Sequence, residues 1–216
     1  MDVTTAVYRR KSVRAFLPTP VSDEAIAELL EKSSRAPSGG NVQPWKIYVV
    51  NGDSMTRFRE FIGDRKPGRA GYPVYPESLK EPYRTARFQL GEAMYATIGI
   101  PREDKPARLR QMAKNFEFFG APSSIFCYVD RQMGSAQWSD LGMFLQTFML
   151  LATEAGLDTC PQEAWAQYEE AVTEFVGAPA ELQLFSGVAL GHADTDHPIN
   201  TLKSQRFPVA DFATWV

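Results

Sequence analysis

Basic side chains crowd the start of the chain. Four of them fall within six positions, at Arg9, Arg10, Lys11 and Arg14. Within this cluster, Arg10, Lys11 and Arg14 combine with the hydroxyl of Ser12 at one turn. This set suits a phosphate monoester, which carries close to two charges and three acceptor oxygens. Lys203 and Arg206, near the other end of the chain, can close on the same anion. The alternative is a solvated helix end, where basic side chains are common.

The overall charge of the protein has the opposite sign. The chain holds 23 basic and 26 acidic residues, a net charge of -3 with a pI of about 5.5. General nucleic-acid and membrane binders usually carry a net positive charge. We therefore expect no nucleic-acid or membrane partner, and the local cluster of bases indicates one small anion.

Several common catalytic motifs are missing from the sequence. There is no HExxH zinc motif, no GxSxG nucleophile elbow and no GxGxxG dinucleotide loop. His192 and His197 lack neighbouring cysteines and make a poor metal site. The segment Gly63–Gly68 has the spacing of a phosphate loop, but Arg and Ala follow it where Lys and Ser or Thr are required. An enzyme with this sequence would take its chemistry from a cofactor.

The size and the cysteines indicate the kind of protein that carries these residues. A length of 216 residues, 44% of them hydrophobic, predicts one globular domain over 1–216. Cys127 and Cys160 are too few for a disulfide framework, so we expect a reducing compartment. The first ten residues lack the apolar core of a signal peptide, and the apolar stretch 141–155 is shorter than a membrane span. A cytoplasmic location is expected.

Two helices, a loop and a strand are predicted before residue 51. A short helix over 2–10 is followed by one that begins after the N-cap Ser22 and stops at Pro37. Prolines bracket two glycines in the segment 37–45, which is therefore a loop whose backbone can approach a ligand. A short buried strand is expected over 46–50.

The segment 63–110 is irregular and basic. It holds six of the 15 prolines, and its ten basic and six acidic residues give it a net charge of +4. Helices are expected around 82–95 and 106–118. Long loops within a compact domain often form lids or binding elements, although a solvated excursion without a role is nearly as common. If the segment is a lid, its arginines, such as Arg65, Arg69 or Arg84, would attract anionic substrates or a nucleotide phosphate.

The second half of the chain mixes strands with helices. Strands are predicted over 124–129, 157–161 and 182–190. A helix over 140–155, capped by Ser139, is apolar on nearly every side, so it should be buried all round in the core or in a dimer interface. There are too few βαβ repeats for a doubly wound sheet, which leaves an α+β fold.

Several segments share an order with a known family. They are Arg-Arg-Lys-Ser-Val-Arg-Ala-Phe (9–16), Arg-Ala-Pro-Ser-Gly-Gly-Asn-Val-Gln-Pro-Trp (35–45), Asp-Leu-Gly-Met-Phe-Leu-Gln-Thr (140–147), Glu-Ala-Gly-Leu-Asp-Thr-Cys-Pro-Gln-Glu-Ala-Trp (154–165), Gly-Val-Ala-Leu-Gly (187–191) and Asn-Thr-Leu-Lys-Ser-Gln-Arg (200–206). In this order they resemble the nitroreductase family of FMN-dependent oxidoreductases over nearly the whole chain. The Pro-Gln-Glu-Ala-Trp motif is most similar to the nitrobenzoate and dinitroaniline reductase branch.

The resemblance implies four sets of flavin contacts. Phosphate and ribityl contacts would come from Arg10, Lys11, Ser12 and Arg14, with Arg14 reaching the pyrimidine side of the ring. Contacts from the partner subunit would come from Pro37, Ser38, Gly39 and Asn41. The ring edge would lie along Pro161, Gln162, Glu163 and Ala164, where a backbone N–H faces flavin N5. A phosphate clamp would come from Lys203 and Arg206, although many relatives have Arg where Lys203 stands.

Two further residues have open roles. Gln146 matches a frequent family glutamine that would either touch the flavin or fill a polar gap in the helix bundle. Cys160 lies beside the ring-edge segment, and a small buried hydrophobe is far more common at such a place than a redox thiol.

The resemblance also implies an activity and an assembly. The activity is NAD(P)H-dependent reduction of nitroaromatic compounds to hydroxylamines or amines, in a ping-pong scheme without a metal. The fold is a mixed β-sheet flanked by helices, in an intertwined homodimer whose C-terminal tail wraps the partner. Alternatives are a flavoprotein of the same fold with another reaction, such as quinone reduction or reductive dehalogenation, a non-enzymatic flavin-binding protein, or a basic-arm nucleic-acid binder.

Overall fold

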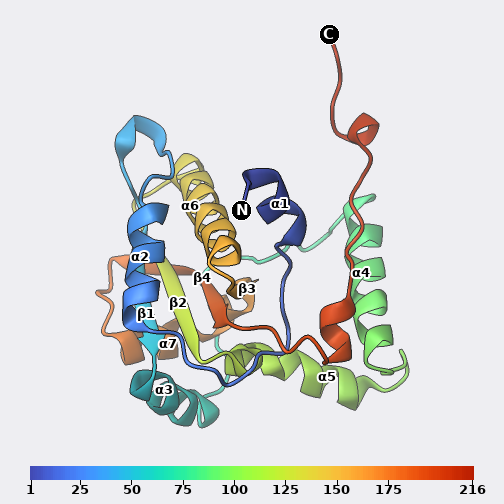
Figure 1. Cartoon of the computed structure of the whole chain (residues 1–216), viewed down its shortest axis with the longest axis horizontal. Helices are drawn as coiled ribbons and strands as arrows, with labels where there is room; N and C mark the ends of the chain where they lie inside the picture. The colour runs from blue at the N-terminus through green and yellow to red at the C-terminus, as the bar shows by residue number, and fades with distance from the viewer.

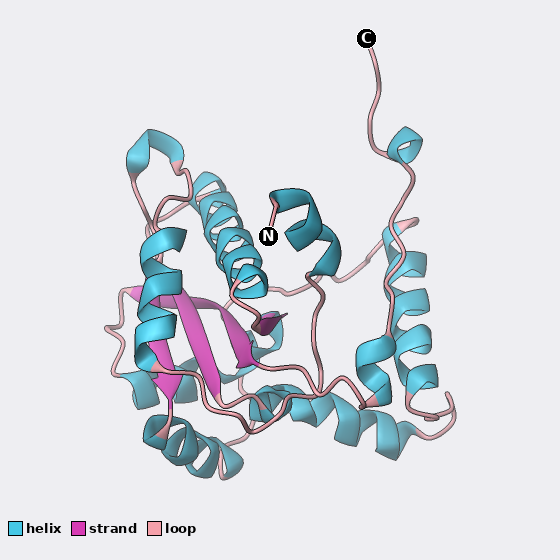
Figure 2. Ribbon diagram, in the orientation of Figure 1, coloured by secondary structure: helices cyan, strands magenta, loops and turns pink.

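A four-stranded antiparallel sheet lies at the centre of the computed structural model, which describes residues 1–216 (Figures 1 and 2). In the order in which they pair, its strands are β1 (Lys46–Asn51), β2 (Ser123–Asp130), β4 (Leu182–Gly191) and β3 (Asp158–Gln162). All four predicted strands are therefore present. An isolated parallel bridge between Ser12 and Thr159 extends the pairing at the β3 edge.

Strand β2 shows how the sheet divides the core. Side chains alternate between the two faces of a strand, so Ile125, Cys127 and Val129 join one hydrophobic cluster while Phe126 and Tyr128 join another. All five side chains are completely buried. The predicted strand β1, by contrast, lies at the edge of the sheet, and only its Val50 is buried.

Helices α2 (Asp23–Ser33) and α6 (Ser135–Glu154) cover one face of the sheet, and α1 (Val3–Arg9) lies beside α6 (Figure 1). The predicted N-cap Ser22 accepts from the backbone N–H of Ala25 at 3.1 Å, as expected. Helix α2 ends at Ser33, before Pro37. Helix α6 packs against both α1 and α2 and ends one turn before β3 begins.

Helix α6 differs from its prediction at its start and on one face. It begins at Ser135 rather than Asp140, because the backbone N–H of Gly134 donates to the side chain of Gln137 at 3.2 Å. The expected cap Ser139 instead donates to the carbonyl of Ala136. Gly142 and Gln146 are exposed in the single chain, so the helix is not buried all round in the core of one chain, and burial in a dimer interface stays a prediction. No helix of the protein combines the length and apolar character needed to cross a bilayer.

The other face of the sheet is covered by aromatic side chains from short helices. These are α3 (Asp53–Gly63), α7 (Glu169–Val176) and the 3₁₀ helices η2 (Lys114–Gly120) and η3 (Glu163–Tyr168). At their centre is the fully buried indole of Trp165, whose ring meets those of Phe58 and Phe118. Gly187 on β4 leaves room for this ring, since a Cβ there would lie 2.4 Å from Trp165 Cδ1.

The segment between α3 and β2 forms an arm at the side of the molecule (Figure 1). Helices α4 (Tyr83–Thr97) and α5 (Lys105–Ala113) match the expected positions, but α5 ends early and η2 continues the segment. Helix α4 has no buried residue and runs beside the C-terminal segment, where it contacts the 3₁₀ helix η4 (Pro198–Thr201). Beyond the last short helix, η5 (Val209–Asp211), the tail extends away from the body.

Candidate functional site

The basic segment predicted to grip phosphate runs along the free edge of β3. Ser12 forms the parallel bridge with Thr159, and the N–H of Val13 donates to the Thr159 carbonyl at 3.0 Å. These contacts place Arg10 to Arg14 beside the strand that leads into the predicted ring-edge segment. The hydroxyl of Thr159 is 1% exposed and has no hydrogen-bond partner in the protein.

Asn200 joins this segment to the C-terminal part of the chain. Its buried side chain accepts from the N–H of Arg14 at 2.8 Å and donates to the carbonyls of Ala15 and Asp194, both at 2.8 Å. The ammonium of Lys11 donates to the Asn200 carbonyl at 2.5 Å. Lys11 therefore binds the backbone at Asn200. An anion that bound the Lys11 ammonium would share it with the Asn200 carbonyl.

Bases from both ends of the chain meet here. Arg10 has a lowered pKa because its guanidinium is half-buried and, secondly, because the positive charge of Arg206 lies nearby. Arg206 is turned toward its own loop, where it donates to Ser204 Oγ at 2.7 Å. No carboxylate forms an ion pair with any of the predicted phosphate ligands Arg10, Lys11, Arg14, Lys203 and Arg206. Like charges gathered without a counterion are suited to an anionic ligand.

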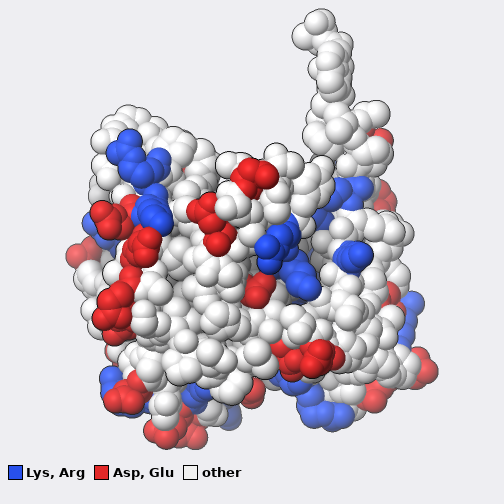
Figure 3. Space-filling model, in the orientation of Figure 1, with Lys and Arg blue, Asp and Glu red and all other residues white.

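The surface view is consistent with this grouping. In Figure 3, Lys and Arg side chains gather around a hollow between α1 and the arm that carries α4. Elsewhere on the same face, blue and red side chains are mixed, as expected for a solvated surface. The local excess of positive charge therefore coincides with a concave part of the molecule.

The ring-edge segment lies within reach of the same bases. Pro161 and Ala164 are half-buried, Glu163 is exposed, and the side chain of Gln162 is almost completely buried. The preceding Thr159 is bridged to Ser12, and the charges of Arg14 and Arg10 act on the neighbouring Cys160. The structure therefore brings three of the four predicted sets into one region, since Lys203 and Arg206 follow directly on the anchored Asn200.

The Cys160 thiol is set apart from these polar groups by burial. Burial raises its pKa to about 11, and the positive charges of Arg14 and Arg10 offset part of this rise. The thiol is then neutral at physiological pH and behaves as a small apolar side chain, because the reactive species is the thiolate.

We expect iodoacetamide to leave Cys160 unmodified at pH 8 in the folded protein. The variant Cys127→Ala isolates this thiol for mass spectrometry, and the same variant in guanidinium is the positive control. The labelling rate should rise only as the pH approaches 11, where the thiolate forms. Complete labelling within minutes at pH 7 would contradict the assignment and indicate a redox-active thiol.

The loop set Pro37, Ser38, Gly39 and Asn41 lies elsewhere in the chain. The N–H of Gly39 points to the buried carboxylate of Asp140 near the start of α6, at 3.3 Å. The basic segment lies beyond the other end of that helix (Figure 1). From Asp140 to Glu154 the helix rises about 20 Å, so the loop and the bases of one chain do not line the same pocket. Gln146 is exposed between them, on the uncovered face of α6.

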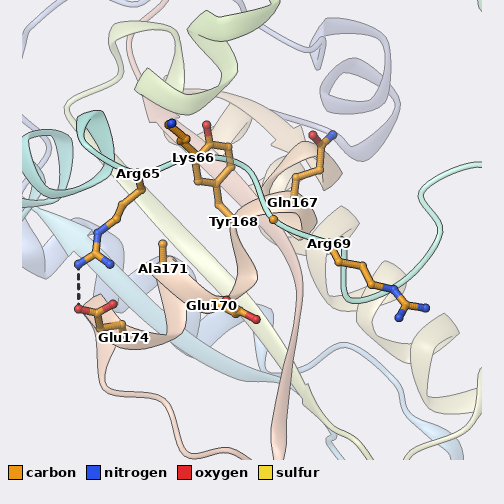
Figure 4. Close-up of a pocket in the computed structure, with 9 residues that line it drawn as sticks. Arg65, Lys66, Arg69, Gln167, Tyr168, Glu170, Ala171 and Glu174 are labelled. Atoms are coloured by element: carbon orange, nitrogen blue, oxygen red, sulfur yellow. Dashed lines mark hydrogen bonds and ion pairs between the residues drawn. The ribbon is translucent and has the colours of Figure 1, made fainter.

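Two of the three bases considered for substrate attraction are neutralised locally. Arg65 pairs with Glu174 at 2.9 Å and Arg84 with Glu81 at 2.6 Å. Arg69 lines a cavity of about 150 Å³ formed with Lys66 and the η3–α7 junction, and its guanidinium points away from the Arg65–Glu174 pair (Figure 4). Of the three, Arg69 is therefore best placed to meet an incoming anion.

Two residues near the site could not be found from sequence reasoning. Asn115 of η2 accepts both hydrogens of the Gln162 side-chain amide, across 47 positions of sequence. Asn200 lies within one of the family-like segments, but nothing in its spacing indicates that it ties the two chain ends together. Asn115 binds the side chain of Gln162, and Asn200 binds backbone groups of Arg14 and Ala15. Both contacts join residues distant in sequence, for which a single sequence carries no signal.

Basic side chains without carboxylate partners border the edge strand of this α+β fold. This arrangement is typical of a protein that binds an anionic ligand. The model of the family described as "Nitroreductase family" matches residues 7–192. The chain belongs to the nitroreductase family, as the sequence motifs predicted.

Relatives of known activity cover nearly the whole chain. It is 34% identical to the 4-nitrobenzoate reductase of Pseudomonas putida over 95% of this chain and 91% of that protein. It is also 34% identical to the nitrobenzene nitroreductase of Ectopseudomonas oleovorans, over 96% of this chain and 93% of that one. Both relatives are reductases of nitro compounds, in agreement with the expectation of an enzyme.

Solved structures agree in fold. The FMN- and NADPH-dependent nitroreductase NfnB from sphigopyxis sp. strain HMH superposes with a TM-score of 0.96 at 40% identity, over 100% of this chain and 99% of that one. NfnB from Mycobacterium smegmatis, solved with NADPH, gives 0.92 at 26% identity with full coverage of both chains. The predicted nitroreductase-like α+β fold is confirmed, and the cofactors of these neighbours are those expected from the sequence.

Proposed function

We propose that this protein binds FMN and uses NADH or NADPH to reduce nitroaromatic compounds, such as substituted nitrobenzenes or nitrobenzoates, to hydroxylamines or amines by a ping-pong mechanism. The observation that carries the proposal is that the basic segment Arg10 to Arg14 lies along β3, is tied by Asn200 to the C-terminal part of the chain and has no carboxylate partner, in a chain of the nitroreductase family. No side chain is proposed as a catalytic acid or base.

The residues present fit a flavin mononucleotide. Burial and, secondly, the nearby positive charge of Arg206 lower the pKa of Arg10, and the negative charge of a phosphate would stabilise its guanidinium against both. Lys11, Ser12 and Lys203 would complete the phosphate and ribityl contacts. The set therefore offers guanidinium forks, ammonium groups and a hydroxyl to one doubly charged group.

The remaining contacts would act on the ring. Bound FMN supplies the chemistry, since it accepts a hydride from a nicotinamide nucleotide and then passes electrons to a nitro group. Arg14 is proposed to place positive charge on the pyrimidine side, where negative charge develops. A backbone N–H of the segment Pro161, Gln162, Glu163 and Ala164 is proposed to donate to the ring edge and fix its orientation.

The function is tested on the purified protein. We expect a yellow protein with a flavin absorption spectrum, which NADH or NADPH bleaches without oxygen and 4-nitrobenzoate restores. A quinone and a halophenol, run with both nucleotides, are the comparison substrates. A colourless protein that takes up no FMN would refute the proposal. If the flavin turned over with the quinone but not with the nitro compound, the protein would still be a flavoprotein, but the proposal of nitro reduction would be refuted.

A homodimer is proposed as the working form. The uncovered face of α6 carries Gly142, Met143 and Gln146, and the apolar tail residues Phe212 and Trp215 are 70% and 81% exposed. A second copy would cover both, with the tail wrapping its partner. The separation of Pro37, Ser38, Gly39 and Asn41 from the bases of the same chain supports a loop that serves the partner's flavin.

We expect the substitution Gly142→Arg to convert the dimer into a monomer. An added Cβ at Gly142 meets nothing within 4 Å in the single chain, so the new side chain clashes only with a second copy. Gly63→Arg, at another helical glycine with open space around it, is the matched control. Light scattering after size exclusion gives the mass. A monomeric wild type, or a Gly142→Arg protein that stays dimeric, would contradict the proposal.

The chain is further proposed to act as one nitroreductase-like domain with a lid over residues 63–110. Cys127 and Cys160 are both buried and unpaired, which suits a reducing compartment, and we propose a cytoplasmic location.

Within the lid over residues 63–110, Arg69 is proposed to attract anionic substrates. Its reversal to Glu should raise the KM for 4-nitrobenzoate severalfold, while Arg84→Glu, at an ion-paired base, should not.

A further inference from the structure

The side chain of Gln162 is held by one residue. It is 2% exposed, and its Nε2 donates to the carbonyl of Asn115 at 2.7 Å and to Asn115 Oδ1 at 3.2 Å. An amide nitrogen has two hydrogens, so Asn115 satisfies both. The Gln162 Oε1 has no partner in the protein. Every polar contact that orients this side chain is therefore made by Asn115.

Asn115 is itself fixed in one orientation. Its Nδ2 donates to the carbonyl of Met112 at 2.9 Å, at the end of α5, so its Oδ1 faces Gln162. The 3₁₀ helix η2 that carries it is anchored a few residues later by Phe118 and Phe119. Both phenylalanines are buried, with φ of 52° and 54°, a left-handed conformation that bulky residues adopt only where packing imposes it. The acceptor is therefore presented from a rigid support.

Gln162 lies next to the backbone that carries the proposed ring contacts, so a shift of Gln162 would displace those contacts. It is the last residue of β3, paired across the sheet with Gly187, and the backbone turns directly after it into Glu163 and Ala164. The side chain of Trp165, three residues on, fills the core against Gly187. The segment is thus fixed at Trp165 by packing and at Gln162 by hydrogen bonds, with the proposed ring contacts between the two.

We propose that Asn115 is a positioning residue, which holds Gln162 and thereby sets the backbone of Glu163 and Ala164 against the flavin. The inference rests on the proposed function, because it assumes that this segment contacts FMN. It assigns a role to the end of the arm that follows the proposed lid over 63–110, since α5 leads directly into η2. A change of packing in the arm would reach the flavin through the Asn115–Gln162 contact.

The first experiment uses the protein without FMN. Asn115→Leu removes the side-chain acceptor Oδ1, whereas Asn115→Asp keeps it. Both variants keep the backbone carbonyl that accepts from Gln162, and both lose the bond to Met112. Hydrogen exchange followed by mass spectrometry should show several-fold faster exchange of the amides of residues 162–165 in the Leu variant only. Equal protection in both variants, or equal loss in both, would overturn the proposal.

The second experiment uses the protein loaded with FMN. Loss of one hydrogen bond should change the ratio of oxidised to reduced flavin at a fixed potential by about fivefold, which is a shift of about 20 mV. The affinity for FMN should stay within about twofold. Gln162→Met removes both bonds to Asn115, including the one that Asn115→Leu removes. In the Gln162→Met background, Asn115→Leu should therefore add no further shift.

An unchanged potential in a folded Asn115→Leu protein, or shifts that add in the double variant, would overturn the positioning role. A wild-type protein that takes up no FMN would instead refute the proposed function. In that case the exchange measurement still decides whether Asn115 controls the segment.

Discussion

Replacing Arg10 by Gln is expected to raise the dissociation constant for FMN by about tenfold to a hundredfold, because a hydrogen bond to a charged group contributes about 1.5–3 kcal/mol. Arg10 is half-buried beside Arg206 and has no carboxylate partner, so its charge is available to the phosphate. Flavin fluorescence quenching, titrated at fixed ionic strength, measures the effect.

Arg9 provides the matched control for this measurement. It is the neighbouring base, exposed at the end of α1, and Arg9→Gln should change the dissociation constant by less than about twofold. In the FMN-free protein, Arg206→Gln should not lower stability, since it removes a like charge from beside Arg10. Equal weakening by Arg9→Gln and Arg10→Gln would indicate a diffuse charge effect in place of a phosphate site.

The largest effect on stability is expected at Trp165. Truncation to Ala should lower the free energy of unfolding by about 3–5 kcal/mol, the usual cost of removing a large buried aromatic side chain. The indole is completely buried and meets rings from α3, η2 and β2, so the cavity has little freedom to collapse. Urea denaturation of the FMN-free protein measures this quantity, and Trp165→Phe should recover a large part of it.

A double-variant cycle with Gly187 tests the packing itself. Gly187→Ala alone should cost about 1–3 kcal/mol, because the new methyl would lie 2.4 Å from Trp165 Cδ1. In the Trp165→Ala background the indole is gone and only Phe126 Cε1, at 3.2 Å, stays close, so the same substitution should cost much less. Additive losses would show that Gly187 is required by the strand and not by the indole.

Local features of the fold were predictable where a short stretch of sequence determines them. Ser22 caps α2, and Gly156, with a φ of 78°, follows the end of α6, as their residue types indicate. The start of α6 was not predictable. The backbone N–H of Gly134 is capped by the Gln137 side chain, whereas Ser139, the residue type more common at helix starts, lies inside the helix. The exposure of one face of α6 in the single chain was not predictable either, because apolar periodicity does not separate burial in one chain from burial between chains.

The same division holds for the candidate site. The bases and the ring-edge motif were predictable because residue types and family order indicate them. The pairing of Arg65 with Glu174, and the part played by Asn115 and Asn200, depend on contacts between residues far apart in sequence. Such contacts are created only when the chain folds.

The distance along α6 between the loop at Gly39 and the bases at Arg10 has a genetic consequence. In the proposed dimer each chain contributes bases to one flavin and a loop to the other. An Arg10→Gln chain and a loop-deficient Asn41→Ala chain would each be impaired alone, but a mixed pair would contain one site free of both substitutions. Two defective alleles expressed together should therefore complement each other, with about a quarter of all sites restored by random pairing.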